Sequence, residues 1–224
     1  MLGTLVNAGA ILTGSLAGLL LKKGIPEKMN DAIMKGVALC VLYIGLDGCL
    51  AGTNALITIL SMVLGAILGC LLDLDARLGS LGKFLERLLQ SGSGSLANGF
   101  VTASLLFCVG AMAVVGSLQS GLTGDHTTLF AKSLLDGISS IVFAASLGMG
   151  VALSAAAVLL YQGAITLLAQ ALSPVLSEFV IAEMTCVGSL LIIALGLNML
   201  GITKIKVMNY VPAIFLVIPI CYLF

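Results

Sequence analysis

Three acidic side chains occur within strongly apolar runs: Asp136, Asp47 and Glu183. A carboxylate at bilayer depth costs about 2.5–3.5 kcal/mol on insertion scales, so an acid kept there indicates a function. Asp136 is eight residues into the apolar run 128–147. At 1.5 Å per residue it lies roughly 12 Å down, near the middle of a hydrocarbon core about 30 Å thick. Asp136 is therefore the strongest pointer to a site for a cation, a proton or a small polar solute.

The sequence leaves an alternative explanation open for each acid. Lys132 precedes Asp136 by one helical turn, so an ion pair could neutralise the acid without any function. Asp47 and Glu183 lie nearer the ends of their runs and could sit at the membrane interface. On the topology predicted below, all three lie in the outer half of the membrane, which suits a cation or proton path better than an anion path.

Neutral polar side chains form a second set of candidates. Serine and threonine hydroxyls can bond to the preceding turn of their own helix, whereas Gln162 and Asn198 cannot be satisfied so locally. We therefore expect these two amides to face a cavity or a partner helix. The candidate ion or substrate pathway comprises Asp136, Asp47, Glu183, Gln162, Ser104, Asn198 and Asn7.

Other kinds of chemistry lack support in the sequence. One histidine and the absence of HExxH, GxSxG and a phosphate-binding glycine loop argue against an enzyme. The six cysteines lie in apolar runs without CxxC or Cys/His spacing, which predicts buried thiols and no metal site. No cofactor is expected. Zero net charge, with no basic tract beyond Lys22-Lys23, argues against a nucleic-acid partner.

The composition places these residues in a lipid bilayer. Hydrophobic residues make up 60% of the 224 and charged residues 9%, whereas globular domains are about 25% charged. We expect an all-α, polytopic transmembrane helical bundle that forms a single transmembrane domain over 1–224. The apolar start lacks a basic n-region, which predicts a retained first span and no signal peptide.

Eight apolar segments are long enough to be considered as spans. The last is interrupted by Pro212 and Pro219 and either crosses or re-enters the membrane. The linker 73–98 is predicted to contain an amphipathic interfacial helix over 76–90, followed by a Gly/Ser-rich stretch. The predicted spans are 3–21, 33–51, 55–72, 99–118, 128–147, 151–171, 178–200 and 207–224.

The basic residues predict the orientation of the chain. With these spans, nine of the ten lysines and arginines fall on one side and only Lys132 falls on the other. The positive-inside rule makes the basic side cytoplasmic and places the N-terminus outside.

A faint internal repeat aligns Gly3–Gly14 with Gly99–Gly110 and Ile33–Val37 with Leu134–Ile138. Two three-span units, 3–72 and 99–171, would then have opposite orientations, because three is odd, and 178–224 would add the last segments. Many transporters have this inverted-repeat arrangement. Chance alignment of glycine-rich spans is the alternative.

Three GxxxG motifs predict close helix packing, because a small face lets helices approach in lipid. We expect a homodimer, since one copy of eight short spans leaves little interior for a shielded path. The packing glycines are Gly14, Gly18, Gly48, Gly52, Gly65 and Gly69.

Several strings, above all Phe100–Gly121, resemble the bacterial membrane family of YdfK and YqgA type. The others are Ala131–Gly137, Tyr161–Gly163, Gly196–Gly201 and the opening Gly3–Asn7. The likeness covers nearly the whole chain. It implies a multi-pass protein of the bacterial cytoplasmic (inner) membrane. The family is one of unknown function whose members are often described as candidate transport proteins, so the resemblance implies no particular site residues.

Two functions remain open on the sequence. The first is a small transporter or channel for a cation or small polar solute, with Asp136 as the central site. The second is a non-transporting oligomeric scaffold or sensor, in which the GxxxG faces set oligomer contacts and the helix at 76–90 binds lipid or a partner. For both functions the lipid bilayer is the expected partner, and the sequence does not identify the solute.

Overall fold

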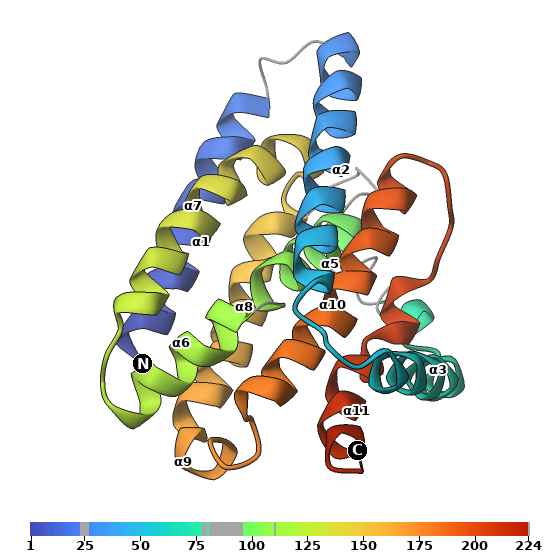
Figure 1. Cartoon of the computed structure of the whole chain (residues 1–224). Coiled ribbons are helices and arrows are strands. Elements are labelled where there is room, and N and C mark those ends of the chain that lie inside the picture. Colours follow the sequence, from blue (N-terminus) through green and yellow to red (C-terminus); the bar gives the residue numbers. More distant parts are fainter. Residues whose placement is uncertain (23–26, 78–79, 81–95, 110, 224) are drawn as a thin grey trace. The chain divides into compact units, whose positions relative to one another are not determined.

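The computed structural model describes residues 1–22, 27–77, 80, 96–109 and 111–223, and in this part the chain is helical without strands (Figure 1). This confirms the prediction of an all-α, polytopic bundle. The helices are α1 (Leu2–Lys22), α2 (Glu27–Cys49), α3 (Ala55–Leu72), α5 (Leu96–Cys108), α6 (Ala111–Leu122), α7 (Thr127–Leu147), α8 (Gly150–Leu167), α9 (Ala169–Leu172), α10 (Glu178–Met199), η1 (Val207–Tyr210) and α11 (Pro212–Cys221).

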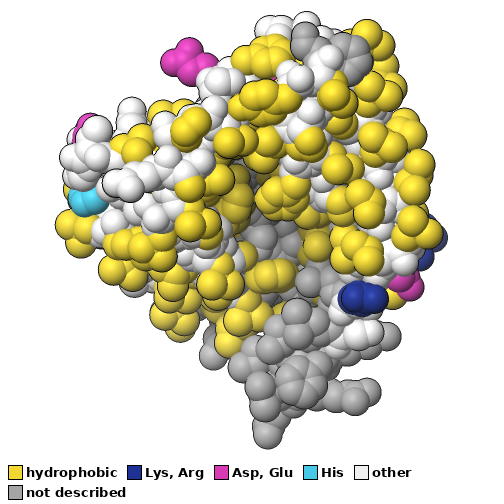
Figure 2. All heavy atoms as spheres, turned by 90° about the horizontal axis from the view of Figure 1, so that it is seen from below, with side chains coloured by type: hydrophobic (Ala, Val, Ile, Leu, Met, Phe, Trp, Pro, Cys, Tyr) yellow, Lys and Arg dark blue, Asp and Glu magenta, His cyan; other side chains and the backbone are white. Residues whose placement is uncertain are grey.

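Six of the described helices are long and apolar enough to cross a bilayer: α1, α2, α3, α7, α8 and α10. Their surfaces fit a lipid environment, because large apolar side chains are exposed on them, such as Leu134 at 66% and Leu160 at 74%. Hydrophobic side chains cover much of the face seen in Figure 2. In water such a surface would promote aggregation.

Two predicted spans differ in the structure. The segment 99–118 is not one straight helix, because α5 ends at Cys108 and α6 continues at an angle of 60°. The amide of Val109 still bonds to the carbonyl of Leu105, which completes the last turn of α5. The segment 207–224 forms η1 and the short helix α11, which begins at Pro212 where a missing N–H is tolerated. Most of the predicted helix at 76–90 lies outside the described residues.

The chain forms two compact units: Met1–Val37 with Ser93–Pro174, and Ala38–Gly92 with Val175–Phe224. In the first unit α1 lies along α7 and also contacts α8, while α5 packs on α8. In the second unit α3 packs against η1 and α11, and α10 contacts both α3 and α11. The sequence-order division into 3–72 and 99–171, and with it the inverted repeat, stays a prediction.

The six predicted packing glycines lie against neighbouring helices of their own unit. A Cβ on Gly14 would collide with the Gly137 carbonyl and the Ser140 hydroxyl of α7, and one on Gly18 with the Ile141 carbonyl. In the second unit Gly48 and Gly52 approach α10, Gly65 approaches α11, and Gly69 approaches η1. The missing side chains therefore permit backbone approaches that any larger residue would block.

The connection between α6 and α7 is stabilised by Asp125, whose carboxylate accepts bonds from the amide and hydroxyl of Thr127 at 2.9 and 2.7 Å. The backbone bond, then the hydroxyl bond, lowers the pKa of Asp125 from its ordinary value. A carboxyl with a lowered folded-state pKa stabilises the fold above its unfolded-state pKa. That stabilisation is lost as the pH falls through the folded-state value.

We therefore expect Asp125→Ala to lower the unfolding temperature at neutral pH and to have a smaller effect at strongly acidic pH. Circular dichroism melts in detergent at the two pH values measure this. Asp125→Asn, which keeps an acceptor oxygen but does not titrate there, is the control. An equal loss for Asp125→Ala at both pH values would show that the carboxylate charge is irrelevant.

Candidate functional site

A buried polar network crosses three helices of the first unit. Lys132 and Asp136 lie one turn apart on α7, with the Lys132 Nζ 2.9 Å from each carboxylate oxygen. Asn7 of α1 donates from Nδ2 to Asp136 Oδ2 at 3.0 Å and to Gln162 Oε1 of α8 at 3.3 Å. Each of the four residues is at most 7% exposed. We call Lys132, Asp136, Asn7 and Gln162 the polar quartet.

The local sequence explains how the quartet is brought together. The spacing of four residues puts Lys132 and Asp136 on one face of α7. The absence of a side chain at Gly14 lets α1 approach α7 closely, which brings Asn7 within reach of Asp136. A polar group without partners is costly in an apolar interior, so these groups bind one another.

Two hydrogen-bonding atoms of the quartet have no partner: the acceptor Asn7 Oδ1 and the donor Gln162 Nε2, both buried. The lysine and aspartate charges cancel. The unmatched atoms of the quartet are therefore complementary to a small group that offers one donor and one acceptor. A bare cation is less well suited, since the Lys132 ammonium would repel it.

The broken helix lies near the charged pair. The thiol of Cys108, the last residue of α5, is within electrostatic range of both Lys132 and Asp136. The last carbonyls of a helix lack intrahelical partners and carry partial negative charge. In α5 the hydroxyl of Ser104 is also buried without a partner. The end of α5 at Cys108 thus lies close to the charged pair of the quartet.

The second unit contains a different buried acid. Glu183 of α10 is 0% exposed, and its Oε1 accepts three hydrogen bonds. The donors are the Thr53 amide at 2.6 Å, the Thr53 hydroxyl at 3.0 Å and the Asn54 amide at 2.9 Å. Asn54 is the N-cap of α3, so this carboxylate binds at the start of that helix.

The structure therefore sorts the predicted pathway residues into several environments. Asp136, Asn7 and Gln162 come together in the first unit, whereas Glu183 and Asp47 belong to the second, where Asp47 is exposed. Asn198 does not face a cavity, because its amide closes the loop that follows α10. Its Nδ2 donates to the Ile205 carbonyl and its Oδ1 accepts from the Thr203 hydroxyl and the Ile205 amide.

The ion pair between Lys132 and Asp136, which the sequence offered as an alternative, does form. The sequence did not identify Lys132 as a member of the candidate site. It also missed Thr53 and Asn54. A threonine and an asparagine directly before an apolar run are the usual signal for a helix start, which could have identified them as donors to a buried acid. Within the described ranges, no three His, Cys, Asp or Glu side chains lie close enough to hold a metal ion.

These features define a polytopic α-helical membrane protein with polar clusters among apolar helices. Comparison with known families shows that the chain belongs to a family of unknown function, DUF554, whose model matches residues 2–222. This confirms the resemblance found in the sequence.

Two curated relatives match over nearly their full length. The uncharacterized membrane protein YdfK of Bacillus subtilis (strain 168) is 34% identical over 96% of this chain and 93% of its own. The uncharacterized protein YqgA of Escherichia coli (strain K12) is 30% identical over 98% and 96%. No solved structure matches this chain.

Proposed function

We propose that this protein is a small membrane transporter or channel, with the polar quartet as the site that a small polar solute occupies. The observation that carries the proposal is the buried quartet itself. Its charged pair is already neutralised, yet Asn7 Oδ1 and Gln162 Nε2 remain without partners. Buried polar groups are normally satisfied, so two unpartnered atoms on amides that bond to each other favour a ligand.

The α5–α6 break supports the same function. Discontinuous helices beside a buried polar site are common in transporters, because their ends supply backbone groups to a solute. A solute with a donor and an acceptor fits the quartet better than a bare cation, which the sequence also left open. The placement in a bacterial inner membrane, the outside N-terminus, the homodimer and the lack of enzymatic activity are parts of this proposal.

The alternative is a non-transporting scaffold or sensor. The observation that favours it is the ion pair, because Lys132 and Asp136 neutralise each other and could serve the fold alone. The two functions differ in the expected effect of removing the unpartnered amide atoms. If the protein is a transporter, their removal abolishes solute flux. If it is a scaffold or sensor, their removal leaves its function unchanged.

The test is solute flux into liposomes that contain the purified protein, measured by stopped-flow swelling with urea, acetamide and glycerol as probes. We expect flux of at least one probe and an approximately tenfold or greater loss in Gln162→Met, a shape-preserving change that removes the free donor together with the Oε1 acceptor of Asn7. Thr13→Val on α1 is the matched control, because the Thr13 hydroxyl bonds only to carbonyls of its own helix. Absence of flux for all three probes, or equal flux through Gln162→Met, would contradict the proposal.

A further inference from the structure

The carboxylate of Glu183 uses its two oxygens unequally. Oε1 accepts all three bonds from Thr53 and Asn54, while Oε2 is buried and has no partner. The side chain is fully enclosed. One of its two oxygens therefore makes no hydrogen bond in an apolar interior, where an unsatisfied polar atom costs free energy.

No positively charged side chain of the described residues pairs with this acid. The ion pairs of the described ranges are Lys35–Asp31 and Lys132–Asp136, and neither involves Glu183. The packed helices α3 and α11 carry no charged residue, and Asp47 of α2 is exposed. Among the described residues, the negative charge is stabilised by the start of α3, through the amides of Thr53 and Asn54, the Thr53 hydroxyl and the helix dipole.

Among the described residues, the titratable groups that approach Glu183 are thiols. Cys186 lies on the same helix, and its carbonyl accepts a bond from the Cys49 thiol of α2. Cys221 of α11 is within electrostatic range of the acid. Gly52 lies between the thiol and the carboxylate, since a Cβ built there would be 2.7 Å from Cys186 Sγ and 3.4 Å from Glu183 Oε2. Thiols are poor ligands for hard cations such as sodium, and a proton needs no coordination shell.

We propose that Glu183 is a proton-binding site of the second unit, with the proton bound at Oε2. Protonation forms the Oε2–H bond with a proton taken from water and leaves Oε1 facing its three donors. Those donors then bind a neutral acid in place of an anion, and such bonds are roughly half as strong. Protonation thus weakens the hydrogen bonds by which Glu183 of α10 binds the start of α3. Proton binding here does not depend on the solute site of the first unit.

The test is pH-difference infrared spectroscopy of the full chain in lipid nanodiscs, without any solute. The C=O band of an acid shielded from water lies at higher frequency than that of an exposed acid. We expect such a band to grow as the pH falls and to be absent in Glu183→Gln. Glu178→Gln is the matched control, because Glu178 is exposed in the first turn of the same helix.

A second variant keeps the test decisive if Glu183→Gln fails to fold. Thr53→Val has the same shape, keeps the backbone amide and removes one donor to the anion. The shielded C=O band should then move to higher frequency, because Oε1 has lost one of its three hydrogen bonds. A shielded band unchanged in Glu183→Gln, no such band at any pH, or an unmoved band frequency in Thr53→Val would overturn the proposal. Loss of solute flux with the band intact would instead count only against the function proposed for the quartet.

Discussion

Asp136→Asn is expected to lower the free energy of unfolding by about 3–5 kcal/mol, because it leaves the Lys132 ammonium buried without its counter-charge. Lys132 Nζ lies 2.9 Å from both carboxylate oxygens, and each of the two side chains is only 8% exposed. The amide that replaces the carboxylate offers one acceptor and no charge. Unfolding in mixed micelles, followed by circular dichroism because the chain has no tryptophan, measures the loss.

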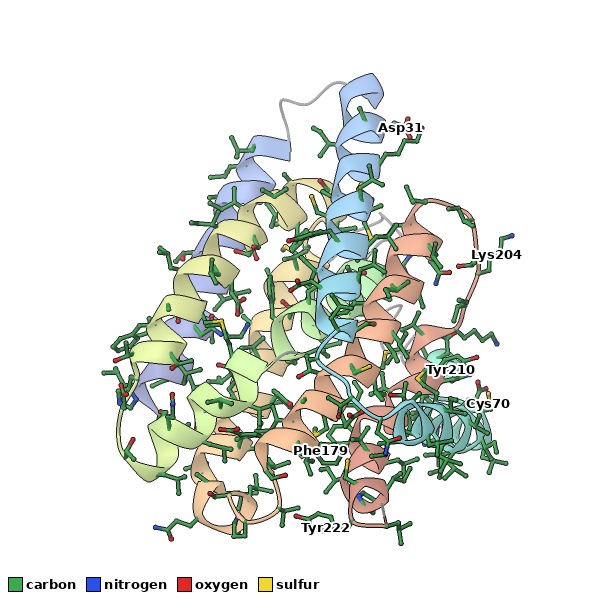
Figure 3. All side chains as sticks on the ribbon, viewed as in Figure 1. Asp31, Cys70, Phe179, Lys204, Tyr210 and Tyr222 are labelled. Atoms are coloured by element: carbon green, nitrogen blue, oxygen red, sulfur yellow. The ribbon has the colours of Figure 1, made fainter. Side chains whose placement is uncertain are left out.

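The chain contains a matched control for this experiment. Lys35 and Asp31 have the same spacing on α2 and a 2.7 Å contact, but their side chains are 64% and 67% exposed. Asp31 projects from its helix in Figure 3. Asp31→Asn should therefore cost less than about 1 kcal/mol. Equal losses for Asp136→Asn and Asp31→Asn would show that burial does not govern the strength of the first pair.

The double variant Lys132→Met with Asp136→Leu separates folding from function. Replacing a buried ion pair by apolar residues of similar volume is often neutral for stability. We expect the double variant to regain most of the stability that Asp136→Asn loses and still to conduct no solute. A double variant that folds and conducts would show that the charged pair is structural only.

Gly14→Ala should be a strongly damaging small substitution on α1. The added Cβ would meet the Gly137 carbonyl and the Ser140 hydroxyl, and backbone cannot rotate away as a flexible side chain can. Overpacking of this kind costs about 1–3 kcal/mol, and it would also move α1 away from α7. Because Asn7 reaches Asp136 across this contact, solute flux should fall together with stability.

Gly9→Ala on the same helix is the control, since nothing lies within 4 Å of the Cβ it would add. It should be neutral or slightly stabilising, because alanine favours helix more than glycine does. The comparison uses the same unfolding and flux measurements. Equal stability of Gly14→Ala and Gly9→Ala would show that the α1–α7 approach is not limiting.

The sequence by itself determined the class of protein. Its apolar fraction predicts membrane helices at nearly the positions that α1, α2, α3, α7, α8 and α10 occupy, because a span needs a long apolar run and little else. Local spacing also determined the Lys132–Asp136 ion pair, since residues four apart share a helix face.

Only the tertiary structure decided which polar residues meet. Asn7 and Gln162 are 155 positions apart and bond because α1 and α8 are neighbours in the first unit. Asn198 also carries an amide, yet that amide bonds to the backbone of Ile205 in the loop seven residues later. Glu183 bonds to Thr53 and Asn54, 130 and 129 positions earlier. Hydropathy indicates whether a segment can lie in the membrane. Which side chains bond across helices depends on how the helices pack, and no local sequence pattern encodes that packing.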